Sequence, residues 1–289
     1  MKIGLTGASG FLGTALVPAA EAAGHEVVRF VRRTPSAGER QWDATTMRPD
    51  DVGDLDAVVH LSGAGVADKR WSASYKKTVL ESRTVSTRAV ADAVSKAGVP
   101  VLLSASGIGY YGDTGAAVLD ETAPAGSTFL ADVCVQWEAA AQSSARTVLL
   151  RTGIVQSRSG GALKKQLPLF KAAAGAPLGS GDQWVSWITL HDHVQAVLHL
   201  LTADVEGPAN LVAPNPVTNA DYTQALGKAV HRPTLPIGVP GLALRAALGE
   251  FAGEVLGGQR LVPAVLEKSG FAWRDPDLPS ALDRALADD

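Results

Sequence analysis

The stretch KIGLTGASGFLG, residues 2–13, decides the fold. Residues 2–5 form a short apolar run that is ended by the glycine turn beginning at Gly7, and residues 11–23 have helix-forming composition and stop at Gly24. The sequence therefore predicts a strand, a turn and a helix. In the turn, Gly7 permits a tight bend, Gly10 lets the backbone approach a pyrophosphate, and Gly13 permits close helix-on-strand packing. We predict nucleotide binding here, the alternative being a purely structural turn. The predicted contacts are Gly7, Ser9, Gly10, Phe11, Leu12 and Gly13.

Short apolar runs recur along the next part of the chain. They lie at residues 26–31, 57–61, 101–104 and 146–151, and residues 72–97 between them have the spacing of one long helix. Short apolar strands separated by helices indicate a parallel sheet covered on both faces, so we predict the doubly wound α/β class. After Thr152, glycine and proline become frequent, which predicts a smaller, mostly helical part.

Composition limits the possible partners. The 289 residues carry a formal net charge of -3 with Lys and Arg spread along the chain, which argues against nucleic acid or a membrane surface as a partner. The one cysteine, Cys134, cannot form an intrachain disulfide. No signal peptide and no apolar run of about 18 residues is found, so we expect a mature chain that starts at Met1 and is cytoplasmic, with a small-molecule substrate.

The end of the second predicted strand bears on the cofactor. Arg32 and Arg33 stand there, and no Asp or Glu accompanies them. An acid at that place would bind the ribose 2′-hydroxyl of NAD, whereas arginines pair with the 2′-phosphate of NADP. We therefore predict NADP as the cofactor. The alternative is that the two arginines are only solvated.

Several stretches resemble extended short-chain dehydrogenase/reductases of the NAD-dependent epimerase/dehydratase type, and within them the atypical sugar-nucleotide epimerase-like (YfcH-type) subgroup. The glycine loop is shared with the whole superfamily, whereas YYG and LGGQRLVP are specific to the subgroup. The stretches are TGASGFLG (6–13), HLSGAGV (60–66), SASGIGYYGD (104–113), RTGIV (151–155), GSGDQWVSWI (179–188) and LGGQRLVPAVLEKSGF (256–271).

The resemblance implies an NADP-binding Rossmann domain at 1–155, and it leaves open a return of later segments such as 184–213 to its sheet. It implies a substrate-side part at 156–289, including a small C-terminal domain at about 240–289. It places Leu61, Ser62, Gly63 and Ala64 near the cofactor, and Arg83 either at the cofactor or in an ion pair on the helix surface. A homodimer through helices at 72–97 and 128–142 is possible, with Val133 and Trp137 facing core or partner.

The helix FLADVCVQWEAA, residues 129–140, lacks two groups that the resemblance implies. The superfamily carries a Tyr-x-x-x-Lys pair there, in which the tyrosine transfers a proton and the lysine holds the nicotinamide ribose. If Glu138 matches the glutamate that follows this pair, Leu130 and Cys134 occupy the two positions. Cys134 is predicted to be a small buried hydrophobe rather than a reactive thiol, because no basic residue neighbours it in sequence.

Other residues are candidates for the missing chemistry. Ser106 matches the superfamily's serine at the end of the fifth strand, and Tyr110 or Tyr111 is a candidate acid, the alternative being that these tyrosines pack against the sheet or line the pocket. His191, Asp192 and His193 are predicted to begin a helix rather than to bind a metal. Trp184 and Trp187 are expected at the substrate cavity. Gln259 and Arg260 are expected to contact an anionic substrate group or a domain interface.

Two functions remain open from the sequence. The first is an NADP-binding oxidoreductase or epimerase-like enzyme with an altered proton-transfer apparatus, which the cluster of Ser106, Tyr110 and Tyr111 favours. The second is a non-catalytic NADP-binding regulator or scaffold, which the missing Tyr-x-x-x-Lys pair favours. One scaffold hosts many chemistries, so the fold does not identify the substrate.

Overall fold

The computed structural model describes residues 1–287. The chain divides into two compact units that interleave along the sequence. Unit 1 consists of Met1–Gly107, Asp132–Arg151 and Val194–Ala209. Unit 2 consists of Ile108–Ala131, Thr152–His193 and the described residues from Asn210 onward.

A seven-stranded sheet organises unit 1, with strand order β11-β7-β5-β4-β1-β2-β3. The strands are β1 (Lys2–Thr6), β2 (Glu26–Val31), β3 (Glu39–Gln41), β4 (Ala57–His60), β5 (Val101–Gly107), β7 (Arg146–Thr152) and β11 (Gly207–Leu211). The pairs β1–β2, β2–β3, β1–β4 and β4–β5 are parallel. The chain runs outward from β1 first in one direction and then in the other, so the strand order reverses between β1 and β4. Ligands of such sheets bind outside the carboxyl ends of the strands at this reversal.

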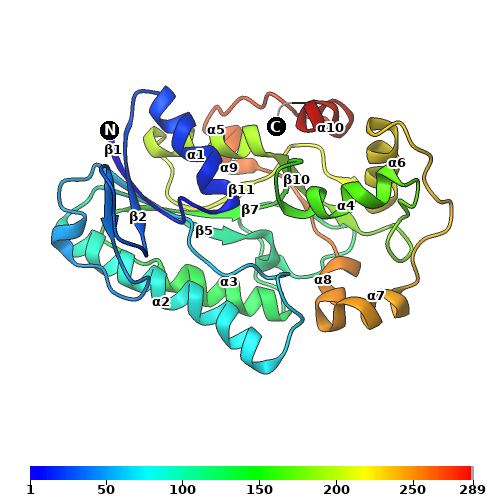
Figure 1. Cartoon of the computed structure of the whole chain (residues 1–289), viewed down its shortest axis with the longest axis horizontal. Coiled ribbons are helices and arrows are strands. Elements are labelled where there is room, and N and C mark those ends of the chain that lie inside the picture. Colours follow the sequence, from blue (N-terminus) through cyan, green and yellow to red (C-terminus); the bar gives the residue numbers. More distant parts are fainter. Residues whose placement is uncertain (288–289) are drawn as a thin grey trace. The chain divides into compact units, whose positions relative to one another are not determined.

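Helices cover both faces of the sheet, which explains why its central strands are largely apolar on both faces. Val58 of β4 belongs to a core cluster with Val90 and Val94 of α2 (Ala73–Ala97), whereas Val59 points to the opposite face. That second face meets α1 (Phe11–Ala22) and α5 (Leu190–Thr202). Figure 1 shows α2 and α3 (Phe129–Ala140) below the strands and α1 and α5 above them. Successive strand residues alternate between the two faces, so each face needs its own apolar set.

Local signals set the ends of the long helix α2. The Ser72 hydroxyl accepts a hydrogen bond from the backbone N–H of Tyr75 and caps the first turn. Gly98 ends the helix in the left-handed conformation, at φ 71°, where glycine has no steric cost. The prediction of one helix at 72–97 is confirmed.

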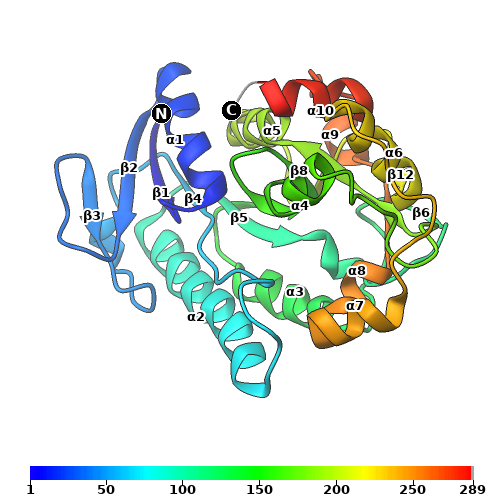
Figure 2. The ribbon, with the colours of Figure 1, turned by 45° about the vertical axis from the view of Figure 1, so that its right-hand side comes forward.

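Unit 2 is built from short elements around a separate core. Its elements are η2 (Ile108–Tyr111), β6 (Val118–Leu119), β8 (Ile154–Gln156), α4 (Gly161–Lys171), β9 (Trp184–Val185), β10 (Trp187–Thr189), β12 (Val217–Thr218), α6 (Asn219–Ala229), α7 (Gly241–Leu248), η3 (Gly249–Phe251), α8 (Ala252–Leu256), β13 (Arg260–Leu261), α9 (Ala264–Lys268) and α10 (Leu278–Ala287). Apolar side chains of α4, α6 and α10 meet around Trp187. Figure 2 shows α6 and α10 side by side.

The sequence-based division at residue 155 differs from this interleaved arrangement. The sheet gains its last strand from β11, which lies inside the 184–213 segment that the sequence analysis left open for a return to the sheet. Residues 184–189 instead form β9 and β10, which pair in two-stranded sheets with β12 and β8. Among residues 1–287, no helix has the length and apolar composition needed to cross a membrane.

Candidate functional site

The glycine loop between β1 and α1 is tightly folded and faces solvent. Gly7 has φ +72°, and a Cβ there would lie 2.8 Å from the backbone carbon of Leu61. A Cβ on Gly13 would lie 2.3 Å from the Gly7 carbonyl oxygen, so α1 approaches its own loop more closely than any side chain permits. Ser9 and Gly10 are exposed, and Gly10 caps α1 without a side-chain hydrogen bond. The first-turn N–H groups of α1 are therefore accessible to an anion.

The loop after β4 continues the same edge of the sheet. Leu61 donates its N–H to the Thr6 carbonyl, and Ala64 donates its N–H to the Ser82 hydroxyl at 3.1 Å. Gly63 is exposed, and a Cβ on it would lie 3.4 Å from Cζ of Arg83. The glycine loop, residues 61–64 and Arg83 thus adjoin one another at the carboxyl ends of β1 and β4.

Arg83 lies inside unit 1, so the alternative of a surface ion pair is excluded. The residue is 8% exposed, and its guanidinium stacks on the Trp137 ring with Cζ 4.8 Å from the ring centroid. It donates one hydrogen bond, to the Val79 carbonyl at 3.0 Å, and burial lowers its pKa. Within the described chain no carboxylate pairs with Arg83.

The two arginines after β2 differ in their contacts. Arg33 forms a bidentate pair with Glu39, with both N–O distances at 2.7 Å. Arg32 is exposed and makes no hydrogen bond or ion pair with the residues that the structure describes. Arg32 is therefore available to a ligand, whereas Arg33 must share its guanidinium with Glu39 or leave it.

Ser106 belongs to a hydrogen-bonded chain with two charged residues. Its hydroxyl donates to Glu138 Oε1 at 2.7 Å, and Arg151 holds both carboxylate oxygens of Glu138 at 2.9 Å. The Arg151 and Glu138 side chains are 4% and 10% exposed. A paired carboxylate only accepts hydrogen bonds, so the Ser106 proton is committed to Glu138 and its oxygen remains as an acceptor.

The two positions of the missing pair hold apolar groups on α3. Cys134 is 6% exposed, and its thiol lies 3.6 Å from the Gly107 carbonyl. Burial and then the charge of Glu138 raise the pKa of Cys134 to about 11, so the thiol is protonated at neutral pH. This is the small buried hydrophobe that the sequence predicts. Leu130 is half-buried.

Two other residues of α3 face the core of unit 1 rather than a partner. Val133 is 1% exposed, and Trp137 donates its indole N–H to the Thr87 hydroxyl. The exposed apolar side chains of this region are Val85 on α2 and Val135 on α3.

The two tyrosines lie in unit 2 and differ in exposure. Tyr111 is 2% exposed and donates its hydroxyl to Asn210 at 2.7 Å, within an apolar cluster that includes Ile108 and Leu261. Tyr111 therefore packs inside unit 2, which is the alternative to its role as the acid. Tyr110 is half-buried and stacks edge-on against Tyr111, with ring centroids 5.3 Å apart. Of the pair, Tyr110 is the more accessible phenol.

The LGGQRLVP stretch is held by hydrogen bonds and ring stacking to other residues of unit 2. The Gln259 side-chain amide donates to the Gly112 carbonyl, and the Ser186 hydroxyl donates to the Gln259 carbonyl at 2.7 Å. The Arg260 guanidinium stacks on Trp184 at 4.0 Å from the ring centroid. Trp187 is fully buried, with its indole N–H donated to the Asn215 carbonyl, so it supports the core instead of lining a cavity.

The His-Asp-His stretch begins α5, as predicted. Asp192 stands in the first turn and accepts hydrogen bonds from the N–H groups of Arg274 and Asp275. His193 is buried, and its Nε2 lies 3.2 Å from the Thr152 hydroxyl. Within residues 1–287 no three His, Cys, Asp or Glu side chains are arranged to hold a metal ion.

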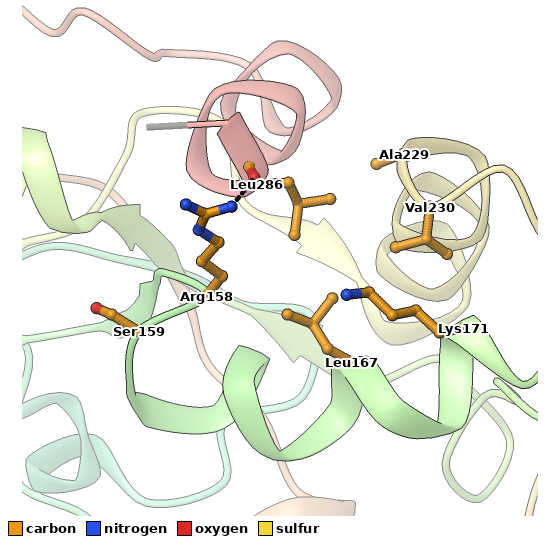
Figure 3. A pocket seen from close by; sticks show the side chains of 7 residues that line it. All are labelled: Arg158, Ser159, Leu167, Lys171, Ala229, Val230 and Leu286. Atoms are coloured by element: carbon orange, nitrogen blue, oxygen red, sulfur yellow. Dashed lines mark hydrogen bonds between the residues drawn. The ribbon is translucent and has the colours of Figure 1, made fainter. Parts of the chain in front are cut away.

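A hollow of about 550 Å³ lies at the junction of α4, α6 and α10 in unit 2. Figure 3 shows Arg158 beside Leu286, to whose carbonyl it donates a hydrogen bond, and Lys171 reaching toward Leu167. The lining residues are Arg158, Ser159, Leu167, Lys171, Ala229, Val230 and Leu286, and no residue of the predicted site is among them.

The residues that hold the site residues in place were not predicted from the sequence. Arg151 and His60 each interrupt an apolar strand, and a polar side chain in a buried strand requires a partner. Arg151 finds Glu138, and His60 lies between the hydroxyls of Thr6 and Ser86 at 2.7 and 3.3 Å. The polar interruption was the available signal, but the partners lie on other elements and the strand pattern does not identify them.

A doubly wound sheet with a glycine loop at its first strand-helix turn defines the class of dinucleotide-binding α/β proteins. Residues 3–213 match the model of the NAD dependent epimerase/dehydratase family, and the chain belongs to this family. Residues 239–285 match a domain of unknown function, DUF1731. The family resemblance found in the sequence is confirmed, including the separate C-terminal segment.

Known relatives extend over nearly the whole chain. "Epimerase family protein Mb2239" of Mycobacterium bovis is 45% identical, covering 97% of this chain and 96% of its own. "Epimerase family protein SDR39U1 homolog, chloroplastic" of Arabidopsis thaliana is 37% identical, covering 98% and 86%. The crystal structure of human epimerase family protein SDR39U1 (isoform 2) with NADPH is 33% identical and covers 100% of both chains with a TM-score of 0.91.

Proposed function

We propose that the protein is an NADP(H)-binding oxidoreductase or epimerase-like enzyme of the atypical extended short-chain dehydrogenase/reductase type. The observation that carries the proposal is the cradle formed by Gly7, Gly10 and Gly13, where a Cβ would meet backbone atoms at 2.3 to 3.2 Å. The relative crystallised with NADPH supports the choice of cofactor. When bound, NADPH supplies a hydride.

The residues present fit a phosphorylated dinucleotide. The N–H groups at the start of α1 would hold the pyrophosphate, since Gly10 leaves them without a side-chain cap. Arg32 would pair with the 2′-phosphate, and Arg33 would assist from its contact with Glu39. Residues Leu61, Ser62, Gly63 and Ala64 would border the cofactor where the strand order reverses.

For the chemical step we propose Ser106 and Tyr110, with Tyr111 as a support. The Ser106 hydroxyl donates its hydrogen bond to Glu138. The serine oxygen would therefore orient a substrate hydroxyl by accepting a hydrogen bond from it. Tyr110 would transfer a proton to or from the substrate, since its phenol is only half-buried while the Tyr111 hydroxyl is donated to Asn210. The substrate is a small molecule of unassigned structure.

A second candidate function is a non-catalytic NADP(H)-binding regulator. It is favoured by Leu130 and Cys134, because leucine has no titratable group to act as the usual acid and a neutral thiol lacks the positive charge of the usual lysine. A panel of carbonyl compounds and sugar nucleotides, followed by NADPH absorbance and product analysis, separates the two functions. Turnover that Ser106→Ala abolishes supports the enzyme. Tight NADPH binding with no turnover on the panel supports the regulator.

The cofactor assignment is tested by calorimetric titration with NADPH, NADP⁺, NADH and NAD⁺. We expect NADPH to bind more tightly than NADH, and Arg32→Ala to remove about 1.5–3 kcal/mol of this preference, since a hydrogen bond to a charged group is worth that much. Arg33→Ala should remove less, because Glu39 already holds that guanidinium. Binding of none of the four nucleotides would overturn the proposal.

We further propose a cytoplasmic protein that acts on small molecules. A homodimer would form through the exposed faces of α2 and α3, where Val85 and Val135 are 43% and 41% exposed. Sedimentation of the wild type and of Val85→Glu tests this dimer. A monomeric wild type would exclude it.

A further inference from the structure

Unit 1 contains a buried positive charge that no acid neutralises. Among the described residues, Arg83 has the Val79 carbonyl, the Trp137 ring and the edge of Gly63 around its guanidinium, and none of these carries a negative charge. An arginine has five N–H donors and keeps its proton in proteins, so Arg83 has donors beyond its one hydrogen bond, and these lie at the slightly exposed edge of the residue where a ligand can reach them. A buried charge of this kind is costly unless a ligand satisfies it.

The other titratable groups near Arg83 do not cancel its positive charge. In residues 1–287, Glu138 is the carboxylate that acts on Cys134, and Arg151 already holds both of its oxygens. Cys134 interacts electrostatically with Arg83, yet its thiol is neutral at pH 7 because its pKa is raised to about 11. Tyr75, the remaining titratable group that acts on Arg83, donates its hydroxyl to the Gly65 carbonyl. Arg83, Arg151 and Glu138 therefore sum to one positive charge.

The position of Arg83 fixes which half of a dinucleotide faces this charge. Arg83 adjoins Gly63 after β4, and Cys134 beside it contacts Gly107 at the end of β5. Arg32 follows β2, on the other side of β1. With the pyrophosphate at the glycine loop and the 2′-phosphate at Arg32, the nicotinamide half extends toward β4 and β5.

Resting on the proposed NADP(H) binding, we infer that Arg83 makes the site selective for the reduced cofactor. The nicotinamide ring is positively charged in NADP⁺ and neutral in NADPH. A fixed, poorly solvated cation at the ends of β4 and β5 repels the oxidised ring and leaves the reduced ring unaffected. The same charge would stabilise negative charge on a substrate oxygen in the transition state of hydride transfer, which is shared by both directions, so the selectivity lies in which form of the cofactor the site binds.

The test compares dissociation constants for NADPH and NADP⁺, measured by calorimetry on the full chain. The wild type should bind NADPH about tenfold more tightly than NADP⁺, which corresponds to about 1.4 kcal/mol. In Arg83→Met, which keeps an apolar chain against Trp137, the two constants should differ less than about twofold. Arg83→Lys, which restores the charge, should regain most of the preference. The matched control Arg88→Met, an exposed arginine on the same helix, should not change it.

A second variant keeps Arg83 and changes its neighbour. Cys134→Ser, which is neutral like the thiol it replaces, should leave the preference for NADPH unchanged. A wild type with equal constants, or a preference that survives Arg83→Met, would overturn the inference while leaving the cofactor assignment in place. A wild type that binds no nucleotide would overturn the proposed function and this inference with it.

Discussion

Replacing Arg151 by methionine tests whether the buried ion pair holds Ser106 in place. The change keeps an apolar chain of similar length in β7 but leaves the Glu138 carboxylate, among the described residues, with Ser106 as its one remaining hydrogen-bond donor. The two side chains are 4% and 10% exposed, so the carboxylate cannot recover its hydration. Breaking a buried pair from one side costs about 3–5 kcal/mol. For a chain of 289 residues, whose unfolding entropy is about 0.6 kcal/mol/K, that loss lowers Tm by roughly 5–8 °C.

A double-mutant cycle separates the pair from the rest of the packing. Replacing both partners, as Arg151→Met with Glu138→Leu, should bring stability back to within about 2 kcal/mol of the wild type, because no unpaired charge remains. The assay is thermal and urea unfolding followed by circular dichroism. Arg48→Met, which breaks the exposed pair between Arg48 and Asp51, is the matched control and should cost less than about 1 kcal/mol. An Arg151→Met variant no weaker than this control would refute the reasoning, and so would a double variant as unstable as the two single losses together.

Three further predictions concern single residues. Gly13→Ala should abolish NADPH binding and lower Tm, because its Cβ would meet the Gly7 carbonyl at 2.3 Å, whereas Gly253→Ala, with nothing within 4 Å, should change neither. Burial lowers the pKa of His60 to about 3 from 6.5, so the unfolded chain takes up a proton below pH 6.5 that the folded chain does not. The stability linked to His60 is therefore full above pH 6.5 and lost toward pH 3, by about 1.4 kcal/mol per pH unit. Tm of His60→Gln should fall less steeply with acid, and parallel curves would contradict this. Cys134 should resist iodoacetamide at neutral pH until urea exposes it, while rapid alkylation of the folded chain would show a thiol more acidic than its burial implies.

The sequence predicted the elements whose signals are local. The glycine turn, the helix capped by Ser72 and Gly98, and the apolar strands each follow from neighbouring residues, and all are present. Contacts between residues far apart in sequence could not be predicted. Arg83 stacks on Trp137, which lies 54 positions further along the chain, and this contact depends on how α2 packs against α3. Tyr110 and Tyr111 are adjacent in sequence, yet only the fold shows that Asn210 accepts a hydrogen bond from the hydroxyl of Tyr111.

The proposed function requires that the glycine loop and the loop after β4 together hold NADP(H). Hydrogen exchange of the full chain, with and without saturating NADPH, tests this claim most directly, because it reports where protection arises. We predict slower exchange in residues 7–13 and 61–64, with little change around the hollow at α4, α6 and α10. Binding of NADPH that leaves both loops unprotected would contradict the account, since the nucleotide would then occupy another part of the molecule.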